Sequence, residues 1–163
     1  MGLSTAAGLG SFGQAWAAPL PAPQGKVVLS IGGKIENTNK GDLAELDMPM
    51  IEAIATESFT TKTPWYKEPV TFSGVPMTKL LDYVKATGTT LSVTALNDYA
   101  TDIPIADFKT YPVILATKRD GNYMPVRDKG PLFIVYNYDS NAELQHQRFY
   151  SRSAWQVARM VVK

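Results

Sequence analysis

Residues 70–84 read VTFSGVPMTKLLDYV, and this stretch decides how the rest of the chain is interpreted. Its first three residues are β-branched or aromatic and end at Ser73-Gly74, which predicts a short strand over Val70–Phe72. The second half changes to helical spacing, with apolar residues at i, i+3, i+4 and i+7, so we expect a core-facing helix that is closed by Gly88. The apolar positions of this helix are Met77, Leu80, Leu81 and Val84.

Short strands and helices alternate irregularly on both sides of this stretch, without a repeated strand–helix–strand unit. The pattern predicts a mixed, strand-rich α+β domain of layered sheets, with about eight strands and three or four short helices. The Asp120-Gly121 pair favours a tight turn, and the apolar runs on either side of it favour central, buried strands. The expected strands are 26–31, 59–66 (running into a loop), 70–72, 90–95, 100–103, 112–117, 131–136 and one from about 154, with helices at about 49–55, 77–84 and 142–153 and a single helical turn at 104–108.

Composition narrows the function classes before any motif is considered. The chain has 163 residues, a formal charge of +1, no cysteine and one histidine, His146. One domain over residues 25–163 suits this length. The near-zero charge argues against nucleic-acid binding, and a chain without cysteine has no thiolate for a metal site or a nucleophile. We expect His146 to be a surface or capping residue.

Residues 1–24 carry no charged side chain and run to Ala15-Trp16-Ala17-Ala18-Pro19, which matches the small-residue pattern of a signal-peptide cleavage site. A basic region is missing and glycines interrupt the apolar part, so a flexible tail is the alternative to a signal-peptide remnant. No stretch is long and apolar enough to predict a membrane span. The expected location is periplasmic or secreted, and a cysteine-free exported chain fits a bacterial periplasm best.

The order of these elements resembles the oxidoreductase molybdopterin-binding domain of the sulfite oxidase family, over roughly residues 45–163. The helix entry G-x-P-L-x-x-L-L of that family is matched with methionine in place of the first leucine. Its matching residues are Gly74, Val75, Pro76, Met77, Leu80 and Leu81. The resemblance implies an α+β fold of layered sheets, and for active members an oxidoreductase activity that depends on a molybdenum-pterin cofactor held by a cysteine thiolate.

The chain departs from that family where the metal ligand is expected. Counting back from Gly74 places the ligand within residues 57–62, which read ESFTTK, and the chain has no cysteine. The hydroxyls of Ser58, Thr60 or Thr61 are much poorer donors than a thiolate. The basic and histidine residues that would grip the pterin pyrophosphate are not evident either. We therefore expect no cofactor, no metal and no catalytic residue, and keep molybdopterin as the alternative.

Several aromatic, amide and basic residues are candidates for binding a ligand in the vestigial cofactor cleft. The spacing of Arg148 and Arg152 places both on one helix face, where a carboxylate such as Asp98, Asp128 or Glu143, or a bound anion, would offset their repulsion. Each candidate also has a purely structural interpretation: a packed aromatic, a turn residue or a surface ion pair. The candidates are Trp65, Tyr66, Asn97, Asp98, Tyr99, Arg127, Lys129, Arg148 and Arg152.

The leading hypothesis is an exported, non-catalytic relative of the molybdopterin-binding domain. It would bind a small anionic or polar ligand, or a periplasmic protein partner, in a cleft where the loop after Thr60, the turn 97–99 and the segment 127–129 converge. One alternative is an oxidoreductase that holds molybdopterin without a cysteine ligand. A purely structural or partner-docking role is the other.

Overall fold

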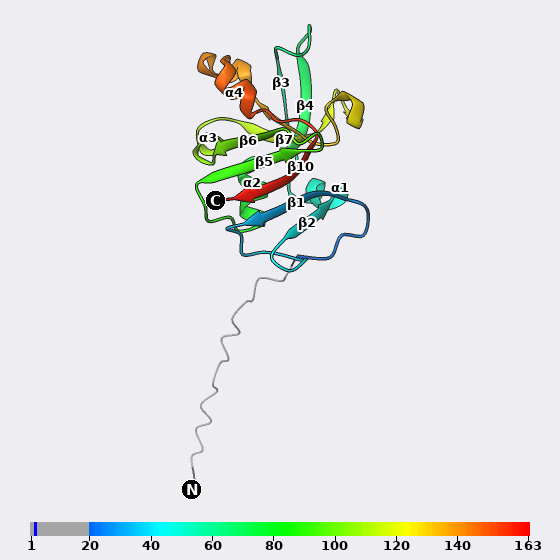
Figure 1. Ribbon diagram of the computed structural model, residues 1–163, viewed down its shortest axis with the longest axis vertical. Helices are drawn as coiled ribbons and strands as arrows, with labels where there is room; N and C mark the ends of the chain where they lie inside the picture. The colour runs from blue at the N-terminus through cyan, green and yellow to red at the C-terminus, as the bar shows by residue number, and fades with distance from the viewer. Residues whose placement is uncertain (1, 3–19) are drawn as a thin grey trace.

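A computed structural model describes residue 2 and residues 20–163 (Figure 1). In this part of the chain there are ten strands in two sheets and four short α-helices, so the expected mixed, strand-rich α+β class is confirmed. The strands are β1 Val27–Gly33, β2 Ala44–Asp47, β3 Glu57–Thr61, β4 Val70–Pro76, β5 Thr90–Ala95, β6 Ala100–Pro104, β7 Val113–Arg119, β8 Asn122–Tyr123, β9 Phe133–Tyr136 and β10 Val157–Val162. The α-helices are α1 Met48–Ile54, α2 Met77–Tyr83, α3 Ala106–Thr110 and α4 Gln147–Arg152, and the 3₁₀ turns are η1 Val126–Asp128, η2 Tyr138–Ser140 and η3 Ala142–Leu144.

The strands form two five-stranded sheets. The first has the order β2-β1-β10-β5-β6, and the second has the order β3-β4-β7-β8 with β9 also paired to β7. Only β1 and β10 pair in parallel among the described strands, so the last strand of the chain inserts between the first strand and β5. In Figure 1 the β3–β4 hairpin and α4 stand together at the upper end of the domain. This end of the fold carries the candidate site.

The helix predicted from residues 77–84 is present as α2, and its predicted face is buried. Leu80 and Val84 are 0% exposed, and Leu81 is 6% exposed. The predicted end at Gly88 is wrong, because the helix stops at Tyr83 and Lys85 turns the chain in the left-handed region (φ 52°). The amides of Lys85 and Ala86 donate to the carbonyls of residues 82 and 81, which satisfies the last turn without glycine.

Most other predicted elements occur near their expected positions. Asp120 and Gly121 have positive φ and form the tight turn between β7 and β8, and β7 and β9 are buried in the core as the apolar runs indicated. The predicted helix 142–153 is wrong in extent: it divides into η3 and α4, because His146 leaves the helical conformation and caps α4. The sequence interpretation also missed β2 and the two-residue β8.

The predicted N-terminal segment lies mostly outside the described residues, which begin again at residue 20. Leu20 is buried, the Asn39 side chain donates to the carbonyl of Pro21, and the amide of Gln24 donates to Asp47. Residues 20–24 therefore contact the folded domain. No helix in the described part of the chain is both long and apolar enough to cross a membrane.

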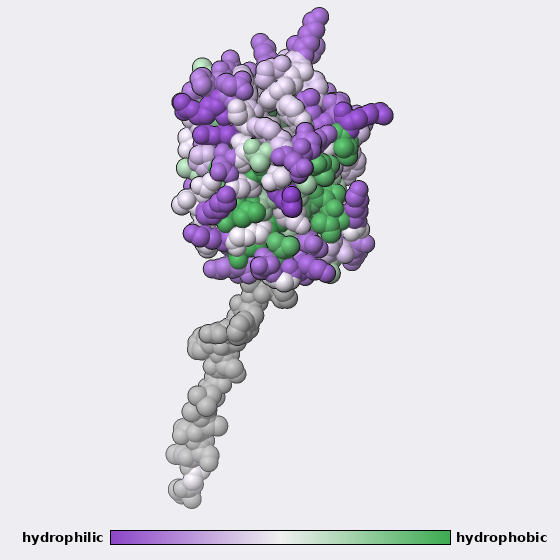
Figure 2. Space-filling model, viewed as in Figure 1, coloured by the Kyte–Doolittle hydropathy of each residue, from purple (hydrophilic) through white to green (hydrophobic). Residues whose placement is uncertain are grey.

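The outer surface on the face shown in Figure 2 is largely hydrophilic, with smaller apolar areas between the polar side chains. Five large hydrophobic side chains are exposed in the described residues, among them Tyr99 at the candidate site. The other four are Leu96, Tyr123, Val126 and Val161. The apolar side chains otherwise gather in one core that draws on both sheets and on α2.

Candidate functional site

A pocket of about 370 Å³ opens between the segment after β3, the β5–β6 turn and α4. Its volume falls in the lower part of the range, roughly 300–1,000 Å³, that is usual for small-molecule sites. None of the side chains that line it is an acid, a histidine, a lysine or an arginine. The lining residues are Pro64, Trp65, Asn97, Tyr99, Gln147, Tyr150, Ser151, Ser153, Ala154 and Trp155.

Trp65 forms the wall of the pocket on the side of β3. The hydroxyl of Thr63 accepts hydrogen bonds from the backbone amides of Trp65 and Tyr66, each at 3.2 Å, which folds the chain into a turn around Pro64. The indole ring lies edge-to-face against Tyr150 (centroids 5.8 Å apart) and Trp155 (5.6 Å). It also packs on Phe133 of the core, so the wall is held by the fold itself.

The β5–β6 turn supplies a second part of the pocket lining. Asp98 takes a positive φ of 67°, and the side-chain oxygen of Asn97 accepts the amide of Tyr99 at 3.2 Å, a local bond that suits this tight turn. The hydroxyl of Tyr99 donates to the carbonyl of Ser151 at 2.6 Å. This bond ties the turn to α4 across 52 residues of sequence and leaves the Tyr99 ring 45% exposed.

Helix α4 closes the pocket and begins at a histidine cap. The Nδ1 atom of His146 accepts the amide of Arg148 at 3.0 Å, so the only histidine of the chain is a capping residue, as expected. Gln147 and Ser151 lie one turn apart and are joined by a side-chain hydrogen bond of 3.3 Å. Ser153 is buried and its hydroxyl contacts the hydroxyl of Tyr138 and the carbonyl of Phe149.

Several polar groups of the lining make no hydrogen bond within residues 20–163, among them the indole N–H groups of Trp65 and Trp155 and the hydroxyl of Tyr150. The one buried side-chain polar atom without a partner in that range is the side-chain oxygen of Asn137. The indole nitrogens and the Tyr150 hydroxyl are therefore open to solvent. Buried polar groups are normally paired, so these accessible donors are free to meet a ligand.

Tyr66 and Lys129, two further predicted residues, lie outside the pocket lining in a polar cluster beside it. Arg119 forms an ion pair with Asp128 at 2.6 Å, and the hydroxyl of Tyr66 donates to Asp128 and accepts from Arg119. The hydrogen bond and charge of Arg119 hold the pKa of Asp128 below its ordinary value, while partial burial raises the pKa of Tyr66. The ammonium of Lys129 lies 5.1 Å from the Tyr66 ring and 4.8 Å from the Trp155 ring.

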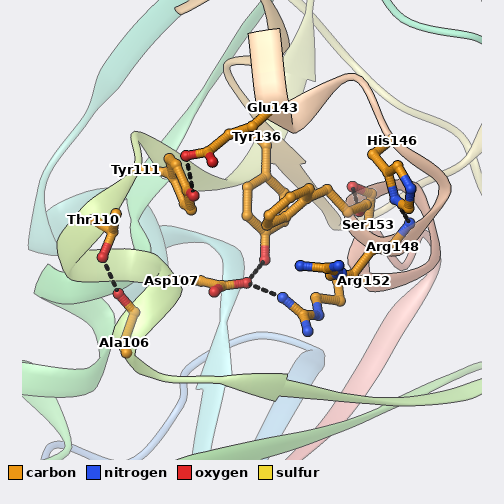
Figure 3. Close-up of polar contacts among 11 residues, drawn as sticks. Ala106, Asp107, Thr110, Tyr111, Tyr136, Glu143, His146, Arg148, Arg152 and Ser153 are labelled. Atoms are coloured by element: carbon orange, nitrogen blue, oxygen red, sulfur yellow. Dashed lines mark hydrogen bonds and ion pairs between the residues drawn. The ribbon is translucent and has the colours of Figure 1, made fainter. Parts of the chain in front are cut away.

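The structure corrects the partner that the sequence suggested for Arg152. Its guanidinium forms an ion pair with Asp107 of α3 at 2.8 Å, and not with Asp98, Asp128 or Glu143 (Figure 3). The same Asp107 oxygen accepts the hydroxyl of Tyr136 at 2.7 Å. Burial, and then this bond to a carboxylate, raises the pKa of Tyr136 far above its ordinary value. Glu143 instead accepts the hydroxyl of Tyr111.

The remaining two arginines do not join the pocket. Arg127 lies on η1 and Arg148 on α4, both exposed, and within residues 20–163 neither side chain makes a hydrogen bond or an ion pair. The pocket therefore brings together three of the nine predicted residues, Trp65, Asn97 and Tyr99, with Asp98 on the same exposed turn. The sequence interpretation missed Gln147, Ser151 and Ser153, although the helical pattern could have placed Gln147 and Ser151 on one face of α4.

The segment expected to hold a metal ligand is the regular strand β3, paired along its length with β4. The Thr60 hydroxyl bonds to Thr71, and the Thr61 hydroxyl, which is buried, donates to the carbonyl of Lys62 and accepts the amide of Asp139. Both hydroxyls are already engaged, and the pocket lining offers no cation for a pyrophosphate. No group of three or more acidic or histidine side chains gathers for a metal ion in the described residues. The residues present do not fit a molybdenum-pterin cofactor.

Comparison with known proteins gives a likeness of fold. No family model and no curated protein matches the chain. Among solved structures, the crystal structure of the sulfane dehydrogenase SoxCD from Paracoccus pantotrophus is similar, with a TM-score of 0.60 and 14% sequence identity over 82% of this chain. The matched part is 37% of the SoxCD chain. At this identity the likeness supports a distant structural relationship.

Proposed function

We propose that this chain is an exported, non-catalytic binding domain that holds a small, uncharged polar ligand in the pocket between Trp65, the β5–β6 turn and α4. The observation that carries the proposal is the lining itself, which combines four aromatic rings with amides and hydroxyls and contains no charged side chain. A concave site with apolar walls and a few polar groups is the usual form of a small-molecule site.

The same lining supports binding without a chemical step. General acid–base catalysis needs a group that exchanges a proton near neutral pH, and the pocket has no histidine, acid or lysine to do so. The hydroxyls of Ser151 and Ser153 donate to the carbonyls of Gln147 and Phe149, with no base placed to activate them. This set of side chains is therefore suited to binding a ligand and not to catalysing a reaction.

The absence of charged side chains from the lining also favours a neutral polar ligand over an anionic one. An anion needs arginine, lysine or backbone amides aimed at it, and the arginines at positions 127, 148 and 152 do not line the pocket. Arg152 is already paired with Asp107. The proposal is therefore a neutral polar ligand, and not an anion.

Export is part of the proposal and rests on the uncharged stretch that ends at Ala15-Trp16-Ala17. Expression of the full chain in a Gram-negative bacterium, followed by fractionation and N-terminal sequencing, tests it. The expected product is a periplasmic protein whose first residue lies within 16–20. A full-length product confined to the cytoplasm would contradict export.

Binding is tested by a screen of neutral polar small molecules against ¹⁵N-labelled protein. A ligand of this pocket should shift the indole N–H signals of Trp65 and Trp155 together with the side-chain amides of Asn97 and Gln147. Signals from Asn122, which lies on β8 outside the pocket lining, serve as the internal control. Protein that purifies with about one molybdenum per chain would overturn the proposal, as would a screen in which no compound moves the pocket signals.

A further inference from the structure

We infer that the ligand is a hydroxylated ring of the carbohydrate class, stacked on an aromatic wall of the pocket and bound through the amides of Asn97 and Gln147. The inference rests on the proposed function, because it names the ligand class of the same pocket. It follows from the shape of the aromatic walls, the kind of polar groups between them, and the charges that surround them.

The aromatic walls meet as a corner. The ring of Trp65 is inclined at 74° to Tyr150 and at 82° to Trp155, so neighbouring walls stand nearly at right angles. A flat heteroaromatic ligand prefers offset stacking on a ring face, and neither Tyr150 nor Trp155 lies parallel to Trp65 to sandwich such a ligand against it. A puckered ring with an apolar C–H face and polar groups around its edge fits a corner, since one face packs on a ring while the rim remains free.

The polar groups of the lining can both donate and accept hydrogen bonds, which is what a hydroxyl requires. An amide carries two N–H donors and an oxygen acceptor, and the amides of Asn97 and Gln147 come from two different elements, the β5–β6 turn and α4. The Tyr150 hydroxyl can both donate and accept a hydrogen bond, and the accessible indole N–H groups add donors. A ligand with several adjacent hydroxyls would satisfy this mixture without leaving a charged group unpaired.

The surroundings disfavour a cation, which is the other ligand that aromatic walls attract. Lys129 already places its ammonium 4.8 Å from the Trp155 ring, so this ring is in use by a cation of the protein itself. The lining has no carboxylate to balance a second positive charge. A quaternary ammonium ligand on Trp155 would therefore lie close to a like charge.

The test is a titration of the purified protein with cellobiose, maltose and N,N′-diacetylchitobiose, followed by calorimetry and by tryptophan fluorescence. Trp65 and Trp155 both line the pocket, so a bound sugar should change the fluorescence. Tetramethylammonium chloride, sodium sulfate and adenosine are the comparison probes. We expect saturable binding of at least one saccharide and none of the comparison probes.

Two matched pairs of variants locate the binding. Tyr99→Ala removes an exposed tyrosine of the pocket, and Tyr123→Ala removes an exposed tyrosine that bonds Glu52 elsewhere. Gln147→Ala removes a pocket amide, and Gln145→Ala removes an exposed amide outside it. The pocket variants should weaken saccharide binding about tenfold or more, while the control variants change it less than about twofold.

The outcomes separate this inference from the proposed function. Saccharide binding that is insensitive to Tyr99→Ala and Gln147→Ala would overturn the inference. Adenosine, sulfate or tetramethylammonium binding that both variants weaken, with no saccharide bound, would also overturn the inference while upholding a binding pocket. If no probe binds and the broader screen of neutral compounds also leaves the pocket unperturbed, both proposals fail.

Discussion

Helix α4 has two sides that use opposite chemistry. On one side Arg152 pairs with Asp107, which also accepts the Tyr136 hydroxyl, in a charged cluster that is mostly removed from solvent (Figure 3). On the other side Gln147, Tyr150 and Ser151 line a neutral pocket open to solvent. One arginine of the helix is thus used to dock it against α3, and the uncharged residues of the other side are left to meet a ligand.

The comparison shows why charge alone is a poor guide to a binding site. A guanidinium close to the core needs a partner, because removing it from water without one is costly. Asp107 meets that need from within the fold, and the same carboxylate oxygen also accepts the Tyr136 hydroxyl. An exposed amide or ring has no such need, so it remains available to a ligand.

Substitutions on the charged side of α4 should lower the free energy of unfolding most. Asp107→Ala leaves the guanidinium of Arg152 and the hydroxyl of Tyr136 without their shared acceptor, and we expect a loss of about 3 kcal/mol in the free energy of unfolding. Urea denaturation measures it. Glu143→Ala, which removes an exposed carboxylate bonded to Tyr111, is the control and should cost less than about 1 kcal/mol. Equal losses would show that the buried pair does not fix α4.

A smaller loss is expected when only one bond of the charged cluster is removed. Tyr136→Phe deletes the hydroxyl that donates to the Asp107 carboxylate but keeps the ring, and a hydrogen bond to a charged group is worth roughly 1.5–3 kcal/mol. Tyr138→Phe deletes a hydroxyl that bonds only the neutral Ser153 and should cost about 1 kcal/mol. A larger loss for Tyr138→Phe in urea denaturation would reverse this order.

The exposed ion pair beside the pocket gives a still smaller, pH-dependent effect. Because Arg119 lowers the folded-state pKa of Asp128 below its ordinary 3.8, the pair stabilises the fold fully above about pH 4, and that contribution is lost as pH falls through the lowered pKa. With side chains 25% and 38% exposed, it should amount to no more than about 1 kcal/mol.

Asp128→Asn tests that pH dependence against the native chain. The difference in unfolding free energy between the two proteins should be present at pH 6 and shrink as the pH falls below about 4. Denaturation curves at pH 6, 4, 3 and 2.5 provide the measurement. A difference that stays constant over this range would mean that Asp128 does not gain its stabilising role from ionisation.

The pocket side of α4 should show the smallest effect on stability. Gln147→Ala removes an exposed side chain and places a good helix former in α4, so the unfolding free energy should change by no more than about 0.5 kcal/mol. Thermal denaturation checks this, and ligand titration of the same variant should show weakened binding. A strongly destabilised Gln147→Ala would mean that the pocket lining is itself structural.

Local sequence patterns predicted the elements that form through interactions between residues close together in the sequence. The spacing of Leu80, Leu81 and Val84 predicted α2, and Asp120-Gly121 predicted the turn after β7. Strand β2 was missed because its four residues run directly into α1, which leaves too few residues for a period of two to show. The break before α4 was missed because it depends on the histidine cap of a single residue.

The site was predicted only in part, because its contacts join distant segments. Aromatic character was enough to suggest Trp65 and Tyr99, since large rings need either a core or a ligand. The partner of Arg152 lies 45 residues away on α3, and no spacing rule connects the two. Only the folded chain shows which arginine is already paired and which amide is left open.

The central position of β10 has a consequence for how the chain is made. Val157–Val162, at the end of the sequence, must lie between β1 and β5 before the first sheet is complete. During synthesis from the N-terminus, β1 and β5 therefore emerge before the strand that joins them, and this sheet cannot close until β10 has also emerged from the ribosome.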